Sequence, residues 1–326
     1  MLKILKSGLQ TTVQDLGRYG FQKYGVIASG AMDPYAHRIA NLLVGNQDND
    51  ATLEITLVGP SIQFEEDVFI ALCGGDLTPQ LDGETVGMWR PLAVRKGSTL
   101  TFGAPKMGCR VYLAVAGGIF VPELMNSKST YLRAEIGGFE GRSLKTGDRL
   151  EVGSAPAPHA AALKKAIGEE TEWQVPSPRY SAEPAVRLLK GRQFALFNHD
   201  SQKRLFSDFF SVSASSDRMG YRLEGPLLSL QEPGELISEA VAFGSIQVPS
   251  DGNPIILLAD RQTTGGYPKI GQVASVDLPL VSQLKPGDRL RLEEVSLQEA
   301  QQLLIDEEQK IQQLKISIQL KWEEWA

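Results

Sequence analysis

One seven-residue phrase occurs twice in this sequence, and it limits the fold more than any other feature. LKTGDRL occupies 144–150 and LKPGDRL occupies 284–290, an offset of 140 positions. Before each copy an apolar segment runs into a Gly-Gly pair, LAVAGG at 113–118 and LLADRQTTGG at 257–266. Because these features recur in the same order at similar spacing, the sequence predicts two halves of related architecture. Two repeats are too few for a solenoid, so we expect two similar barrels side by side.

The fold class predicted from the local patterns is mainly β, with a few short helices. The chain holds 32 Gly and 18 Pro among 326 residues, which favours many turns and short strands. Asp82-Gly83 is typical of a type I′ hairpin, because both residues tolerate positive φ. Several apolar or β-branched segments bounded by turn residues predict strands. They are 68–74, 99–103, 110–117, 185–191 and 254–260.

A helix is predicted over 33–44. Asp33 suits the N-cap, Pro34 suits the first helical position and Gly45 ends the pattern. Residues 202–210 are a weaker helix candidate.

The sequence also predicts how the domains are organised along the chain. This organisation consists of a first barrel at 1–152, a linker at 153–184 with a short helix at 159–167, a second barrel at 185–295 and a C-terminal helix or tail at 296–326. The tail could pack on its own domain, pack on a partner or fray.

Composition excludes several function classes. The net charge is −6 and no basic run occurs, so nucleic acid is not an expected partner. No stretch approaches the ~18–20 apolar residues that cross a bilayer, and no signal peptide is recognised, so we expect a cytoplasmic protein with no membrane partner. Cys73 and Cys109 are expected to be buried reduced thiols, with a catalytic nucleophile or a disulfide as alternatives.

The common one-chain catalytic motifs are absent. The sequence contains no P-loop, no Rossmann glycine motif following a strand, no nucleophile elbow and no H-E-x-x-H or C-x-x-C motif. The histidines, at positions 37, 159 and 199, are scattered, so no metal site is predicted. No biotin-carrying lysine motif occurs either, and we expect no covalent cofactor on this chain.

Four glycine-rich stretches carry more polar groups than turns alone require, namely 8–33, 215–226, 244–254 and 259–269. Glycines let backbone N–H groups approach a ligand, and Arg supplies a bidentate fork, so the mixture suits an anion or a carboxylate. The alternative is structured turns whose charges pair internally, for example Asp15 with Arg18 or Asp217 with Arg218. The candidate binding residues are Asp15, Arg18, Ser29, Asp33, Asp217, Arg218, Gln262, Thr263, Thr264, Gly265 and Gly266.

The fourth stretch supplies the catalytic candidates Asp260, Arg261 and Lys269. Asp260 and Arg261 end an apolar strand, residues 263–266 follow as a loop of N–H and hydroxyl donors, and Lys269 comes next. Donors, a cation and a carboxylate at one strand–loop–strand corner can hold an oxyanion without a P-loop. We therefore expect Arg261 and Lys269 to bind an anionic substrate or a phosphate.

These stretches carry a resemblance to a known family. The sequence resembles the allophanate hydrolase subunit 2 family, also described as carboxyltransferase subdomains A and B, which includes KipA proteins and the C subunit of 5-oxoprolinase. The match runs from Gly8 to Val295. The matching phrases are GLQTTVQDLGRYG (8–20), SGAMD (29–33), ANLLVGN (40–46), SDRMGYRLEGP (216–226), GSIQVPSDGNP (244–254) and DRQTTGGYPK (260–269).

The resemblance implies two cyclophilin-like β-barrels and a place in a three-part, ATP-dependent 5-oxoprolinase that opens 5-oxo-L-proline to L-glutamate. It implies two partners, a B subunit of the KipI type and an A subunit of the LamB/YcsF type. It also implies a small-molecule substrate, and ATP with Mg²⁺ in the complex, and it leaves self-association open. Asp15 or Asp260 could position a proton or Mg²⁺, but the spacing assigns neither role.

Two other functions stay open at this point. A KipA-type regulator would bind and counteract a KipI-type inhibitor of a sporulation kinase. A carboxyltransferase component would act with a separate biotin carrier, as the same module does within biotin-dependent urea carboxylase. No biotin carrier or carboxylase segment occurs in this sequence, which favours the oxoprolinase.

Overall fold

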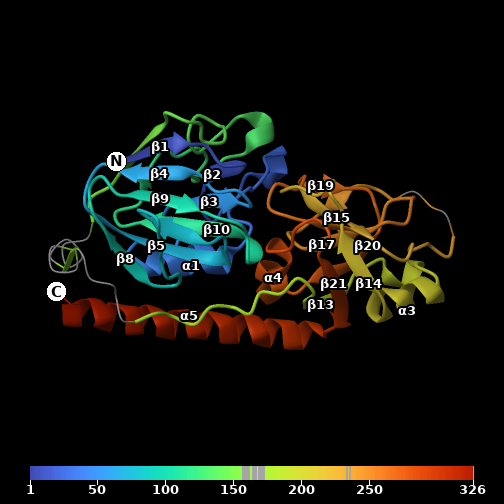
Figure 1. The fold of residues 1–326 in the computed structure, drawn as a ribbon. Coiled ribbons are helices and arrows are strands. Elements are labelled where there is room, and N and C mark those ends of the chain that lie inside the picture. The colour runs from blue at the N-terminus through green and yellow to red at the C-terminus, as the bar shows by residue number, and fades with distance from the viewer. Residues whose placement is uncertain (156–161, 164–166, 168–172, 233, 235, 326) are drawn as a thin grey trace. The chain divides into compact units, whose positions relative to one another are not determined.

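The chain divides into two compact units in a computed structural model (Figure 1). The structure describes residues 1–326 except 156–161, 164–166, 168–172, 233, 235 and 326. The first unit comprises Met1–Arg18, Ser29–Arg179 and Gln309–Ala326, and the second comprises Tyr19–Ala28 and Tyr180–Glu308. Strands dominate both units, so the predicted mainly β fold class is confirmed.

The strands of the first unit form two sheets. In spatial order, the seven-stranded sheet contains β11 (Ile119–Phe120), β12 (Arg149–Val152), β1 (Leu2–Lys6), β4 (Ser61–Phe64), β9 (Thr99–Phe102), β6 (Pro79–Leu81) and β7 (Glu84–Thr85). The five-stranded sheet contains β2 (Gln10–Gln14), β3 (Thr52–Thr56), β10 (Met107–Val115), β5 (Val68–Asp76) and β8 (Pro91–Val94). Asp82 and Gly83 join β6 to β7 with φ values of 52° and 90°, as the hairpin prediction requires.

Both sheets contribute fully buried side chains to the core of this unit. Ile4, Ile62 and Leu100 form a cross-strand row in the seven-stranded sheet, and nearly every residue of β3, β5 and β10 is also buried. Helix α1 (Pro34–Leu43) packs against β5 and β10 (Figure 1). Its start is as predicted, because the Asp33 side chain accepts a hydrogen bond from the Ala36 N–H.

The second unit is built on a closed seven-stranded barrel. In spatial order its strands are β13 (Ala185–Lys190), β20 (Lys269–Val273), β17 (Ser245–Gln247), β18 (Ile255–Leu257), β15 (Gly220–Glu224), β14 (Phe209–Val212) and β21 (Arg289–Glu294). A separate ribbon pairs β16 (Glu239–Ala240) with β19 (Thr264–Gly265). The short helices are η1 (Gln22–Tyr24), η3 (Phe194–Leu196), α3 (His199–Ser207), η4 (Ser275–Asp277) and α4 (Leu278–Ser282), while η2 (Leu132–Ala134) belongs to the first unit.

The weaker helix prediction, 202–210, had wrong boundaries. Helix α3 begins at His199 because the Asn198 side chain accepts a hydrogen bond from the Ser201 N–H, and it ends at Ser207. Phe209 and Phe210 belong to strand β14 instead. Tertiary pairing with β15 and β21 decided this segment, against its local helical pattern.

The repeated phrase adopts the same turn in both units. The Lys145 N–H donates to the Asp148 carboxylate at 2.7 Å, and the Lys285 N–H donates to the Asp288 carboxylate at 3.1 Å. Gly147 and Gly287 both have positive φ, 96° and 89°. Each glycine N–H then donates to a strand of its own unit, to Ile4 of β1 or to Val212 of β14. The repeat therefore encodes a β-turn that introduces the closing strand.

The C-terminal stretch, predicted as a helix or tail at 296–326, forms one helix, α5 (Leu297–Trp325). The sequence left open packing on its own domain, on a partner or fraying; from Gln309 onward the helix belongs instead to the first unit, where Ile311, Ile318 and Trp322 are buried and the Trp322 indole N–H donates to the Leu43 carbonyl at 3.3 Å. Most of the predicted linker helix at 159–167 lies outside the described residues. No helix in the described part of the chain combines the length and apolarity that crossing a bilayer requires.

Candidate functional site

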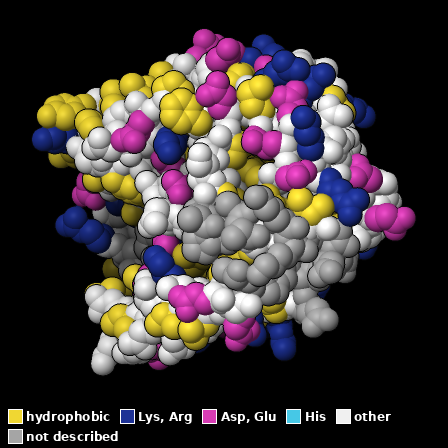
Figure 2. Space-filling view, turned by 90° about the vertical axis from the view of Figure 1, so that its left-hand side faces the viewer, with side chains coloured by type: hydrophobic (Ala, Val, Ile, Leu, Met, Phe, Trp, Pro, Cys, Tyr) yellow, Lys and Arg dark blue, Asp and Glu magenta, His cyan; other side chains and the backbone are white. Residues whose placement is uncertain are grey.

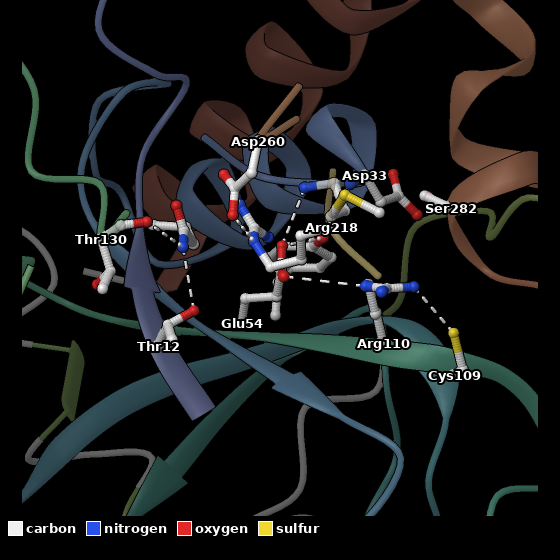
Figure 3. Close-up of polar contacts among 12 residues, drawn as sticks. Thr12, Asp33, Glu54, Cys109, Arg110, Thr130, Arg218, Asp260 and Ser282 are labelled. Atoms are coloured by element: carbon white, nitrogen blue, oxygen red, sulfur yellow. Dashed lines mark hydrogen bonds and ion pairs between the residues drawn. The ribbon is translucent and has the colours of Figure 1, made fainter. Parts of the chain in front are cut away.

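Asp260 stands just beyond β18 in the second unit, and it pairs with Arg218. The Arg218 guanidinium donates from Nε to Oδ2 at 2.9 Å and from Nη2 to Oδ1 at 3.2 Å, and both side chains are buried (Figure 3). In the alternative reading of this stretch as a structured turn, Asp217 could pair with Arg218. Asp217 instead accepts the N–H groups of Met219 and Gly220 in a turn. A bidentate buried pair of this kind anchors two segments of the barrel.

Arg261 differs from Arg218 because no carboxylate pairs with it among the described residues. Its Nε and Nη1 donate to the carbonyls of Val241 and Leu258 at 3.4 and 3.3 Å, and its guanidinium lies 5.7 Å from the centroid of the Phe243 ring. Burial lowers the pKa of Arg261 below its ordinary value, and Tyr19 and Asp260 offset only part of this effect. A half-buried cation without an ion pair favours the binding of an anion.

Lys269 already has a counter-ion. Its ammonium lies 3.0 Å from the Glu239 carboxylate, and the lysine side chain is only 13% exposed. The hydrogen bond from Lys269 lowers the pKa of Glu239 below its ordinary value. Arg261 and Lys269 were predicted to act alike, but the geometry gives them different environments.

The donor loop expected at 263–266 is partly a strand. Thr264 and Gly265 pair with β16, and the Thr263 carbonyl accepts the Val241 N–H at 3.2 Å. A side chain at Gly265 would place its Cβ 2.3 Å from the Gln247 amide nitrogen, so any larger residue there would displace the end of the Gln247 side chain. Gln262 is exposed and Gly266 lies beside Ser238. The candidate anion site therefore centres on Arg261.

The predicted binding residues of the first unit are engaged in holding loops together. The buried Asp15 carboxylate accepts hydrogen bonds from Ser127 Oγ, Ser129 Oγ and the N–H groups of Gly17 and Lys128, at 2.5–2.8 Å. The Arg18 guanidinium, which the sequence offered as a partner for Asp15, donates to the carbonyls of Leu124 and Ser129.

Two further binding candidates of this unit also have structural contacts. Ser29 has φ 56° and its hydroxyl donates to the Thr130 carbonyl at 2.8 Å. Asp33 is the N-cap of α1. The first unit thus uses its predicted binding residues to fix the segments around 15–33 and 127–130.

Sequence reasoning missed a polar row across the five-stranded sheet. Thr12, Glu54, Tyr112 and Cys73 face one another on four consecutive strands, β2, β3, β10 and β5. Glu54 accepts the Tyr112 hydroxyl at 2.8 Å, and Arg110 lies 3.8 Å from Glu54 (Figure 3). The alternation of Thr52, Glu54 and Thr56 along β3 was the available signal, since it marks one polar face.

This polar row positions the loop that precedes α1. Glu54 accepts the Met32 N–H at 2.9 Å, and the Tyr112 oxygen accepts the Asp33 N–H at 2.8 Å. Burial raises the pKa of Tyr112 and of the Cys73 thiol well above their usual ranges, so both stay protonated. Cys73 and Cys109 are both buried and form no disulfide, as expected for reduced thiols.

Asp15 and Asp260, the two carboxylates considered for positioning Mg²⁺, do not fit a metal site. Both oxygens of Asp15 accept hydrogen bonds from four donors, and both oxygens of Asp260 accept from Arg218. In the described part of the chain no group of three or more His, Cys, Asp or Glu side chains is placed to hold a metal.

Figure 2 shows a face on which acidic and basic side chains are interspersed, without a broad patch of one sign.

Comparison with known proteins identifies the family. The model of the carboxyltransferase domain, subdomain A and B, matches residues 24–294. The chain belongs to this family. The family resemblance read from the sequence is therefore confirmed.

The relatives include proteins of similar length and much longer ones. The chain is 40% identical to the C subunit of 5-oxoprolinase from Haemophilus influenzae, covering 93% of this chain and 94% of the relative. It is also 40% identical to the Escherichia coli protein of the same name, covering 96% and 97%. The crystal structure of the K. lactis urea amidolyase matches 95% of this chain with a TM-score of 0.85 and 31% identity, but only 20% of that longer chain.

Proposed function

We propose that this chain is the C subunit of a multi-subunit, ATP-dependent 5-oxoprolinase that opens 5-oxo-L-proline to L-glutamate. The observation that carries the proposal is the 40% identity to two proteins of that name over nearly their whole lengths. The proposed partners are the KipI-type and the LamB/YcsF-type subunits. Under this proposal the chain is part of a hydrolase acting on a cyclic amide.

The chemistry of the substrate explains the need for ATP. A lactam resists hydrolysis because resonance stabilises its amide bond, and phosphorylation of the carbonyl oxygen by ATP would make the carbonyl carbon open to attack by water. The products would be L-glutamate, ADP and phosphate. The substrate also carries a carboxylate, which an enzyme can use as a binding handle far from the reacting carbonyl.

We assign the substrate carboxylate or a phosphoryl oxygen to Arg261. Its guanidinium lacks a carboxylate partner among the described residues and is partly desolvated, so a bound anion would complete it. Lys269 then supports the ribbon through Glu239 rather than binding the substrate itself. The Mg²⁺ of ATP is assigned no residue here, because Asp15 and Asp260 do not fit it.

The proposal is tested by co-expressing this chain with the KipI-type and LamB/YcsF-type subunits. Glutamate release from 5-oxoproline should require ATP and should stop when this chain is omitted. A well-formed complex that releases no glutamate would refute the proposed function.

Two variants test the site within that complex. Arg261→Ala should lower kcat/KM by about 100-fold, chiefly through KM, because a charge-assisted bidentate contact contributes roughly 2–3 kcal/mol. Arg261→Lys should recover only part of this loss, because an ammonium cannot form the bidentate pair. Lys269→Gln should change activity much less. Equal losses in the Arg261 and Lys269 variants would contradict the different roles assigned to them.

Carboxyl transfer is the second candidate, because the K. lactis urea amidolyase shares this fold at a TM-score of 0.85. In that case the chain would transfer a carboxyl group from a biotin carrier to a small amide. Supplying carboxybiotin carrier protein with urea to the purified chain and its partners distinguishes the two. Transfer of labelled carboxylate without glutamate formation would favour this alternative.

A further inference from the structure

A cavity in the second unit is not explained by the anion site. It measures about 670 Å³ and is lined by Phe197 and by three parts of the chain, 228–230 with 234 and 236, 248–250, and 266–268. Phe197, Leu228 and Val248 are buried side chains of this unit, so part of the cavity wall is packed core. A cavity of this size is large enough to take a bulky side chain or a ligand of moderate size.

Among the described residues that line it, none carries a charged side chain. Besides its apolar residues, the cavity offers the hydroxyls of Ser229 and Ser250, the phenol of Tyr267 and the backbone at Gly234 and Gly266. A carboxylate such as that of 5-oxoproline, or a phosphate, would lose its hydration there without gaining a cation. The cavity is therefore unsuited to the anionic substrate of the proposed function, and its occupant should be apolar.

Exposed apolar side chains line the cavity or adjoin its lining residues in the sequence. Tyr267 lines the cavity and is 51% exposed, while Leu227 and Ile237, each next to a lining residue, are 57% and 89% exposed. Leu196, the neighbour of Phe197, is also exposed. Exposed apolar groups on the segments that build a cavity wall are typical of a surface that another protein covers.

Two carboxylates that adjoin lining residues in the sequence indicate the charge of the occupant. Glu232 lies between the lining residues Leu230 and Gly234, and Asp251 follows Ser250. Both are exposed, and neither pairs with Lys or Arg among the residues that the structure describes. Acidic groups around an apolar centre complement a basic flank on a partner, because charges at a rim steer association while the apolar centre supplies affinity.

We propose that this cavity is a docking site for another subunit of the complex, which inserts a bulky apolar side chain flanked by Lys or Arg. The inference rests on the proposed function, since it needs a partner subunit. The lengths of the relatives point the same way. In the K. lactis urea amidolyase the matching region is only 20% of the chain, so the corresponding unit is joined to further protein there.

The test measures association of this chain with the co-expressed KipI-type and LamB/YcsF-type subunits by isothermal titration and size-exclusion chromatography. Leu227→Glu adds a charge at the mouth, and Ser250→Trp fills the cavity from an exposed position. The matched control is Leu297→Glu at the start of α5, where the leucine is 63% exposed and does not line the cavity. Circular dichroism checks that each variant is folded.

We expect Leu227→Glu and Ser250→Trp each to weaken association by at least about tenfold, as for residues at the centre of an interface, while Leu297→Glu stays within about twofold. Asp251→Lys should weaken association several-fold at low salt and less at high salt, because rim charges are screened.

Each other outcome overturns the docking proposal. Wild-type affinity in both cavity variants would do so while leaving the proposed function intact, provided the complex still releases glutamate. Unchanged assembly with impaired glutamate release would assign the cavity to a small molecule. Self-association of the wild-type chain that Leu227→Glu abolishes would assign it to a second copy. If the wild-type chain binds neither of the other two subunits, both the proposed function and the docking site are wrong.

Discussion

Replacing Asp15 with asparagine separates a structural role of this carboxylate from a chemical one. Asp15 has the sequence surroundings of a ligand-binding residue, yet its two oxygens accept four hydrogen bonds inside the first unit. Asparagine keeps the size and shape of the side chain but carries one acceptor oxygen and an amide that can only donate. The substitution therefore tests the hydrogen bonds without creating a cavity.

The expected loss follows from those contacts. Hydrogen bonds to a charged acceptor contribute roughly 1.5–3 kcal/mol, against about 0.5–1.5 kcal/mol for neutral pairs. The donors to Oδ1, from Ser127, Ser129 and Gly17, would weaken, and the Lys128 N–H would face another donor. Part of this loss of stability is offset, because the neutral amide costs less free energy to desolvate than the buried carboxylate. We expect a net destabilisation of about 3 kcal/mol.

Urea unfolding followed by tryptophan fluorescence measures this change in the right unit. All four tryptophans, at positions 89, 173, 322 and 325, belong to the first unit. With an m value of about 1–3 kcal/mol per molar urea, the midpoint should fall by roughly 1–3 M. Asp217→Asn is the matched control, since its Oδ1 accepts two N–H groups at the surface and asparagine can do the same.

A small shift for Asp15→Asn, comparable to that of Asp217→Asn, would refute this reasoning. If that small shift came with loss of glutamate release, Asp15 would belong to the chemistry after all. If stability fell as expected while the complex kept its kcat under conditions where the variant is folded, Asp15 would be a structural residue only.

Three further predictions concern stability. Burial lowers the pKa of His37 from 6.5 to about 4. Between these pH values the unfolded chain binds a proton that the folded chain does not, so the free energy of unfolding should fall by about 3 kcal/mol as the pH drops from 6.5 to 4. Urea unfolding of His37→Asn should not show this pH dependence. Trp322→Ala removes a buried ring that lies edge-on to Phe69 at 4.8 Å; it should cost the first unit about 3–5 kcal/mol in urea unfolding by circular dichroism, whereas the exposed Leu320→Ala should cost under about 0.5 kcal/mol. Gly265→Ala should destabilise the second unit by about 1 kcal/mol by displacing the Gln247 amide, and Gln247→Ala in the same chain should recover most of that loss, as a double-mutant cycle in thermal unfolding would show.

Much of the fold was predictable because local patterns and tertiary contacts agree. The N-cap at Asp33, the hairpin at Asp82-Gly83 and the repeated turn before β12 and β21 each depend on a few adjacent residues. The helix prediction at 202–210 had the wrong boundaries because the local pattern and the tertiary contacts disagree there. There Phe209 and Phe210 gain more from pairing with β21 than from extending α3.

The candidate site was harder to predict because its chemistry depends on which charges are already paired. Arg218, Arg261 and Lys269 look alike in the sequence, as cations beside glycines and carboxylates. Arg218 pairs with Asp260, 42 positions away in the sequence, and Lys269 pairs with Glu239, 30 positions away, so neither cation pairs with a sequence neighbour. Of these three cations, only Arg261 has no ion pair in the described part of the chain, so it is the one that can hold an anion. Which cations are already paired depends on residues far apart in the sequence, and motif spacing does not reveal this.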